Sequence, residues 1–166
     1  IRGELLGGSF SLAANQFKLD NSNSVQLRLS GLQLQEALVL YPTEGLYGQA
    51  TIDGSLPLVL SLKGVFIDQG QLQARQPGTL RFHSEQVRAI GQTNPSMKLV
   101  TDALEDFHFS WLSSELAYEP SGKLLFKVRL EGKNPAIEQG RPIHLNLSLE
   151  EDLPALLASI QLSNHV

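Results

Sequence analysis

The sequence predicts a mainly β protein with a few short helices, in which an antiparallel meander sheet folds into a groove or a sandwich and one helix lies at the C-terminal end. Two observations lead to this fold class. Apolar and polar residues alternate along several segments, and turn-forming Gly, Pro and Asp recur between these segments at short intervals. Parallel strands would need long crossover connections, so the short intervals indicate antiparallel strands.

Residues 1–90 predict strands, a short helix and hairpins. Apolar residues alternate with polar ones over 25–30, which indicates a half-buried strand. Residues 34–41 then change to helical spacing, and Pro42 ends this helix. Asp53-Gly54 predicts a two-residue hairpin turn, because both positions tolerate a positive φ. Further turns are expected at Gly64, 68–71 and 76–79, which would separate strands at 65–68, 71–75 and 79–83.

A second helix is expected to follow, over about 94–107. Asn94 suits the N-cap of this helix, and Pro95 suits its first position because proline lacks the N–H that would be unsatisfied there. A strand comes next, with Phe107 and Trp111 on one phase of the alternation. The alternation then slips before Leu112, which indicates a bulge or a bend.

Two regular strands and a closing helix complete the chain. The strands are expected at 124–130 and 143–149, where apolar residues alternate with polar ones. The helix is expected to begin near Asp152, because proline is tolerated only in the first helical turn and Pro154 then lies there. Residues 1–166 are therefore expected to form one β-rich domain, in which 91–166 contribute a helix, three strands and a capping helix.

Composition excludes several classes of function. The net charge is −4 and the estimated pI is about 5.5, whereas a nucleic-acid partner held through its phosphates would need a basic surface. The apolar runs are far shorter than the roughly 20 residues of a membrane-spanning helix. There is no Cys, which excludes disulfides and thiolate chemistry. Because the chain begins without Met, we expect it to be a piece of a longer protein.

The sequence contains no recognisable catalytic motif, so we expect a protein that is not an enzyme and needs no cofactor or metal. No two of the four His residues have metal-ligand spacing, and no nucleophile elbow, phosphate-binding loop or dinucleotide fingerprint is present. Lys133 and Arg141 flank a loop and could together hold a carboxylate or a phosphate headgroup. Alternatively, Arg141 pins the loop by bonding its carbonyls or Glu138.

Most of the chain resembles the C-terminal region of YdbH-like proteins, which belong to the AsmA-like group. The stretch from about 103 to 162 resembles it most specifically, and residues from about 24 onward resemble it more generally. Its match points are Ala103-Leu104-Glu105-Asp106-Phe107, Tyr118, Gly122, Leu130-Glu131-Gly132, Asn134-Pro135, Gly140-Arg141-Pro142-Ile143 and Leu145-Asn146.

The resemblance implies a non-enzymatic transport protein of the Gram-negative periplasm. Members of this group are anchored in the inner membrane and carry phospholipid between the two membranes along a β-sheet groove with an apolar interior. A small outer-membrane lipoprotein is the implied partner, and the family has also carried a dicarboxylate-transport label. The implied family-motif loop comprises Asn134, Pro135, Gly140, Arg141 and Pro142.

The residues themselves leave the use of the apolar side chains open, because a groove for acyl chains and a filled core need the same alternation. The candidates for lining a groove are Phe107, Phe109, Trp111, Leu124, Phe126, Val128, Leu130, Ile143, Leu145 and Leu147. Two alternatives stand beside a groove. One is a structural domain that pairs with a partner through an edge strand, and the other is a dicarboxylate-binding accessory that uses Lys133 or Arg141.

Overall fold

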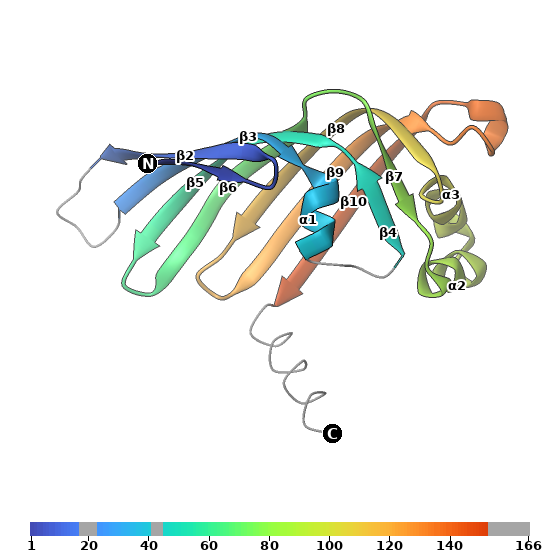
Figure 1. The fold of residues 1–166 in the computed structure, drawn as a ribbon. Coiled ribbons are helices and arrows are strands. Elements are labelled where there is room, and N and C mark those ends of the chain that lie inside the picture. Colours follow the sequence, from blue (N-terminus) through green and yellow to red (C-terminus); the bar gives the residue numbers. More distant parts are fainter. Residues whose placement is uncertain (17–22, 41–44, 153–166) are drawn as a thin grey trace, which may run out of the picture.

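The computed structural model describes residues 1–16, 23–40 and 45–152. In this part of the chain, ten strands form one antiparallel sheet, and short helices lie at its margins (Figure 1). The predicted fold class is therefore confirmed. The strands are β1 (Arg2–Leu5), β2 (Gly8–Gln16), β3 (Asn23–Gln33), β4 (Leu46–Gln49), β5 (Thr51–Ser61), β6 (Gly64–Ala74), β7 (Gly78–Phe82), β8 (Phe107–Tyr118), β9 (Lys123–Lys133) and β10 (Ile143–Asp152).

The sheet is open and divides at β8. Its order runs β1-β2-β3-β5-β6-β8, and β9 and β10 continue beyond β8. Along one edge, β8 pairs with β6 through residues 113–118 and with β7 through residues 107–109. Strand β4 pairs with β7, so β4 and β7 form a short arm that diverges from the long strands (Figure 1).

Of the three α-helices in the described residues, two lie where the sequence predicted a helix. Helix α1 (Leu34–Leu40) follows β3 directly, and α3 (Pro95–Ala103) begins at Asn94, whose side chain accepts a hydrogen bond from the Ser96 N–H. Helix α2 (Glu85–Thr93) was not predicted. Gly91 interrupts its helical pattern in the sequence, yet Gly91 is buried where α2 packs closely on Thr101 of α3. The predicted closing helix lies outside the described residues from 153 onward, and β10 extends to Asp152.

The prediction of a turn at Asp53-Gly54 is wrong, because both residues lie within β5. Asp53 accepts hydrogen bonds from the Gly31 N–H at 2.8 Å and from Arg75 at 2.6 and 3.0 Å. Gly54 leaves room for the side chain of Leu72 on the adjacent strand, which a Cβ at this position would meet. Contacts with distant strands therefore override the local preference of these two residues for a turn.

The turn predicted at 68–71 is also wrong, because the segment lies within β6. Gln69 adopts a φ of 56°, and the register of β6 with β5 and with β8 shifts here. The expected strands at 65–68 and 71–75 are thus one strand with a bulge. The turns predicted at Gly64 and at 76–79 are confirmed by the β5–β6 hairpin and the β6–β7 connection.

Asp53 is expected to make folding sensitive to acid. The hydrogen bond from Arg75 holds the pKa of Asp53 below its ordinary value, and the Gly31 N–H lowers it further against the opposing effect of burial. A lowered folded-state pKa stabilises the protein above the unfolded-state pKa, and this stabilisation is lost as the pH falls through the folded-state pKa. We expect Asp53→Asn to cost about 1 kcal/mol at pH 7, since half-exposed Arg75 is screened by solvent.

Urea unfolding of both proteins between pH 7 and pH 3 checks this expectation. The difference in free energy of unfolding between wild type and Asp53→Asn should narrow below about pH 4. Asp68→Asn serves as the matched control, because Asp68 is an exposed carboxylate of β6. A difference that stayed constant over the whole range would show that the ion pair with Arg75 does not stabilise the fold.

Candidate functional site

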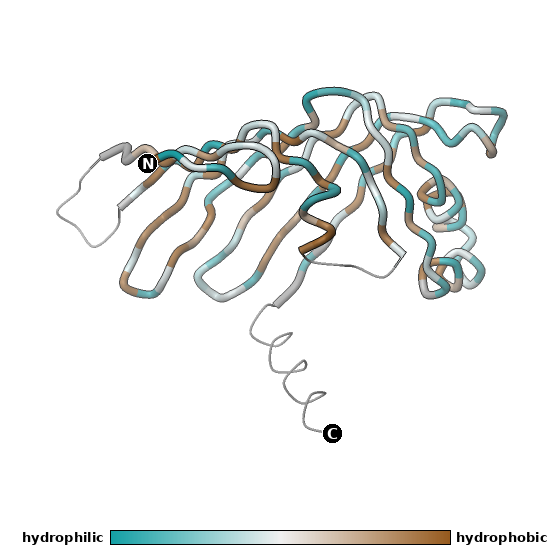
Figure 2. The backbone as a smooth tube through the Cα atoms, in the orientation of Figure 1, coloured by the Kyte–Doolittle hydropathy of each residue, from teal (hydrophilic) through white to brown (hydrophobic). Residues whose placement is uncertain are grey.

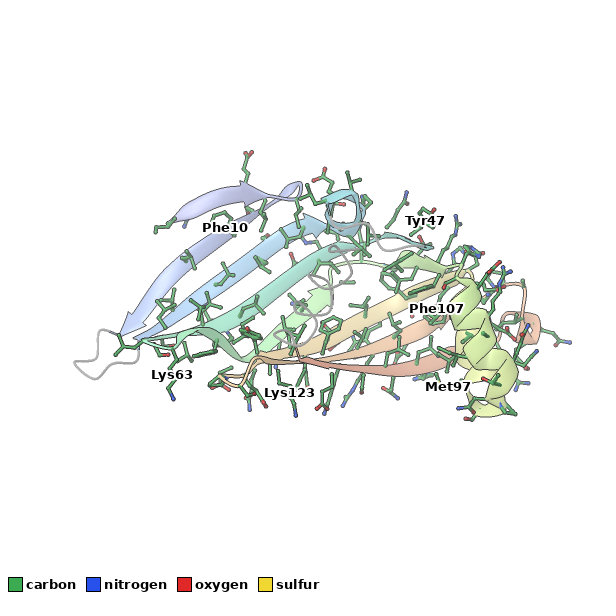
Figure 3. The ribbon with its side chains drawn as sticks, turned by 90° about the horizontal axis from the view of Figure 1, so that it is seen from below. Phe10, Tyr47, Lys63, Met97, Phe107 and Lys123 are labelled. Carbon is green, nitrogen blue, oxygen red and sulfur yellow. The ribbon has the colours of Figure 1, made fainter. Side chains whose placement is uncertain are left out.

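One face of the sheet carries apolar side chains from β2 to β10, and we call it the inner face. The sheet is arched, and Figure 3 views the arch from below, where side chains cover the strands between Phe10 and Phe107. Figure 2 shows apolar and hydrophilic residues alternating along the long strands. Because successive side chains of a strand point to opposite faces, this alternation places the apolar set on one side.

Strand register aligns these apolar residues into rows that cross the strands. In one row Leu12 lies opposite Leu27, which in turn lies opposite Leu56. The side chain of Leu56 contacts Gly70 of β6, and Gly70 lies opposite Leu116. Leu116 then lies opposite Phe126 of β9. A second row runs parallel to it, through Val25, Leu58, Ile67, Tyr118 and Leu124.

The inner face is filled at the end near α3. Here Phe107, Phe109 and Leu130 are almost fully buried, and Val100 of α3 and the following Leu104 pack against this cluster. The remaining buried members of this cluster are Ala50, Ala103, Leu112, Ile143 and Leu145. Sequence candidates Phe107, Phe109, Leu130, Ile143 and Leu145 therefore lie together in a packed core.

Toward the hairpin ends of the strands, the inner face is only half-buried. Sequence candidates Leu124, Phe126 and Val128 on β9 are all partly accessible, as is Leu147 on β10. On the far side of the arch Leu27 and Leu58 have the same intermediate exposure. A partly accessible apolar surface can take up another apolar molecule, because the side chains have water left to displace.

Trp111 does not join the other groove candidates. The register of β8 with β9 shifts between Phe109 and Trp111, so a bulge at Ser110 reverses the alternation one residue earlier than the sequence indicated. Trp111 thus lies opposite Glu131 on the polar outer face and is 45% exposed. The interpretation of Trp111 as part of the same apolar row as Phe107 and Phe109 is corrected by this placement.

The family-motif loop joins α3 to the last two strands through Asn134. This side chain is 2% exposed and donates to the carbonyls of Asp102 at 3.1 Å and Ala103 at 3.4 Å. Its amide oxygen accepts the Ala136 N–H at 2.9 Å. Asn134 therefore bonds two carbonyls at the C-terminal end of α3, of which that of Asp102 also accepts the Glu105 N–H at 3.3 Å.

The other loop residues are at the surface. Pro135, Arg141 and Pro142 are exposed, and Gly140 ends a turn in which Glu138, Gln139 and Gly140 have φ of 50°, 58° and 73°. Arg141 bonds Glu138 through its backbone N–H, at 3.0 Å. Lys133 and Arg141 are both exposed and, within the described ranges, form no ion pair. An anion site at this pair stays a prediction.

Several residues of the inner face were missed as candidates from the sequence. They lie on the first half of the sheet and comprise Phe10, Leu12, Val25, Leu27, Leu29, Leu56, Leu58 and Leu72. Their alternation was visible, but alternation alone does not say which strand pairs with which. The register supplies this and shows that both halves of the chain contribute to one surface.

Several charged side chains on the outer face and along the edges form ion pairs. Asp106 accepts from Arg81 at 3.0 Å and lies 3.1 Å from His108. Burial raises the pKa of Asp106, but the hydrogen bonds from Arg81 and His108 lower it by more. In the described part of the chain, no three His, Asp or Glu side chains come together to hold a metal ion. Over the same ranges, no helix is long and apolar enough to cross a membrane.

Comparison with known proteins identifies the family to which the chain belongs. The sequence model of the family described as "YdbH-like: Intermembrane phospholipid transport protein YdbH" matches residues 1–166, which is the whole chain. Neither the curated proteins nor the solved structures gave a match. A family of lipid transport proteins suggests a periplasmic location and a lipid ligand. The chain belongs to the YdbH-like family of intermembrane phospholipid transport proteins.

Proposed function

We propose that this chain is a segment of a periplasm-spanning phospholipid transport protein, and that its inner face forms an apolar β-groove for acyl chains between the inner and outer membranes. The observation that carries the proposal is the set of apolar rows that cross the strands from β2 to β10. Acyl chains that lie on these rows would keep apolar contact while moving from strand to strand. No covalent bond changes, so no catalytic residue is required.

The half-buried part of the inner face is the proposed place for lipid. The side chains of the packed cluster beside α3 are buried, whereas Phe126, Val128 and Leu147 are partly open. The lipid-facing set therefore consists of the half-buried inner-face residues toward the hairpin ends of the strands, and the packed cluster supports them from one side. Lys123 and Lys63 lie at the hairpin ends of the strands that border this portion (Figure 3).

Native mass spectrometry of the chain, purified from Gram-negative cells without detergent, tests the proposal. We expect phospholipid to co-purify, and we expect Val128→Asp to abolish it, because a carboxylate on the inner face would have to be desolvated against acyl chains. Lys127→Asp is the matched control. It introduces the same charge one residue earlier on β9, where the side chain is exposed on the outer face.

Circular dichroism melting shows whether each variant is folded. Leu27→Asp places the same charge on β3, across the sheet from Val128, and should also remove lipid while leaving β9 intact. Wild-type protein that is folded and free of lipid would refute lipid binding by this segment. Equal loss of lipid from Lys127→Asp would refute the assignment of lipid to the inner face.

A second candidate function is docking through an edge strand. In the described part of the chain β10 pairs only with β9, so its other edge presents unpaired backbone N–H and C=O groups over ten residues. Such an edge can take up a strand from a partner, and a small outer-membrane lipoprotein would be the partner. Under both functions, we propose that the full-length protein is anchored in the inner membrane.

A further inference from the structure

Trp111 is the only tryptophan of the chain, and the bulge in β8 directs it away from the core. The Ser110 hydroxyl donates to the Glu131 carbonyl at 3.2 Å, which fixes the bulge against β9. If β8 were regular here and Ser110 itself lay opposite Glu131, Trp111 would continue the phase of Phe109 and face inward. Bulges are common next to binding sites, where they re-aim a side chain. An indole exposed on a polar face therefore calls for a functional explanation.

Around Trp111 the outer face is hollowed. A hollow of about 460 Å³ lies between Trp111 and polar side chains of β9 and β10, namely Arg129, Glu131, His144 and Asn146. Backbone register brings them together, since Glu131 lies opposite both Trp111 and His144, and Arg129 lies opposite Asn146. Leu130 and Leu145 form the rest of the lining. Ligand pockets in proteins have volumes of roughly 300–1,000 Å³, so the hollow has the size of a small site.

The chemistry of this lining selects for a neutral polar ligand. The positive charge of Arg129 and the negative charge of Glu131 balance, and the Nδ1 atom of His144 lies 3.4 Å from Glu131. Phosphate or a polyanion would meet the Glu131 carboxylate, and a cation would meet Arg129. The side chains offer N–H donors from Arg129 and Asn146 and oxygen acceptors from Glu131 and Asn146.

We propose that this hollow is a saccharide-binding site on the outer face of the sheet. A sugar ring has one face of C–H groups, which can stack on the Trp111 indole, and a rim of hydroxyl groups, which can both donate and accept hydrogen bonds with Arg129, Glu131 and Asn146. An aromatic platform with a polar rim matches both properties. The site lies on the opposite face from the proposed lipid surface and does not depend on it.

The single tryptophan makes the site directly observable by fluorescence. Titration of the chain with chitotetraose, an oligomer of β-1,4-linked N-acetylglucosamine, should produce a saturable shift of the Trp111 emission to shorter wavelength as the sugar displaces water from the ring. Maltotetraose, an oligomer of α-1,4-linked glucose titrated in parallel, tests whether the site distinguishes oligosaccharides that differ in monomer and linkage. A saturable shift with either sugar supports the proposal.

Variants read by isothermal titration calorimetry separate stacking from indirect effects. Trp111→Ala should weaken binding at least about tenfold, and Trp111→Phe should retain part of the affinity because a ring is still present. Tyr47→Ala is the matched control, since Tyr47 is another exposed aromatic, at 64%, outside the hollow. Val128→Asp, which we expect to remove lipid, should leave sugar binding unchanged.

Two results would overturn the proposal. One is the absence of a saturable fluorescence change with both sugars at millimolar concentration. The other is binding that Trp111→Ala leaves unchanged, which would place the sugar elsewhere. If Trp111 emission instead responded only to a protein partner, this face would be a protein interface and not a saccharide site.

Discussion

Replacing Phe109 by alanine is expected to lower the free energy of unfolding by about 4 kcal/mol. Phe109 is 1% exposed and lies in the cluster with Phe107 and Leu130, so its removal leaves a cavity that the arched sheet cannot close. Urea unfolding followed by circular dichroism measures the change. An unchanged dependence on urea concentration would show that the compactness of both states is preserved.

Phe126→Ala supplies the comparison, because Phe126 has the same chemistry and lies on the same face. It is only half-buried, so we expect a loss of about 1 kcal/mol, which reflects the smaller apolar area removed from water. The two substitutions together test the division of the inner face into a filled end and an accessible part. Equal losses would indicate that Phe126 also lies in a filled core, and this would contradict the assignment of an accessible part to the inner face.

Asn134→Ala is expected to cost about 3 kcal/mol. The substitution removes two donated hydrogen bonds and one accepted one from a site that is 2% exposed, and it leaves the Ala136 N–H and the carbonyls of Asp102 and Ala103 without this partner. Thermal and urea unfolding measure the loss. Since Asn134 connects α3 with the β9–β10 loop, we also expect faster hydrogen exchange in α3.

Asn146→Ala is the matched control, because Asn146 is exposed on β10 and its replacement should change stability by less than about 0.5 kcal/mol. Asn134→Asp tests the two donated hydrogen bonds alone. A carboxylate can still accept the Ala136 N–H, but it cannot donate to the carbonyls of Asp102 and Ala103 and is repelled by them. Stability of Asn134→Asp close to that of wild type would contradict the role assigned to the donated hydrogen bonds.

Local patterns predicted much of the second half of the fold. The strands at 124–130 and 143–149 correspond to parts of β9 and β10, and Asn94 and Pro95 begin α3 as expected. These features follow from alternation and from capping, which depend on neighbours in sequence. The position of the packed cluster could not be predicted in this way, because a half-buried and a filled apolar face have the same pattern.

Features that depend on distant partners were missed or misplaced. Asp53-Gly54 has the sequence of a turn, but Arg75 and Gly31 hold Asp53 within a strand. Trp111 has the phase of Phe109 in the sequence, but a bulge at Ser110 reverses its direction. The pairing of β8 with both β6 and β7 is likewise a property of the assembled sheet.

Under the proposed function, the rows of the inner face give lipid no preferred direction of movement. Neighbouring strands are about 4.8 Å apart, so an acyl chain crossing the sheet would meet similar apolar steps of that length in both directions. A path with equivalent steps has no intrinsic bias, and lipid on it would diffuse back and forth with equal ease. Net flow would then be set at the two ends of the path, by the supply of lipid at one membrane and its removal at the other.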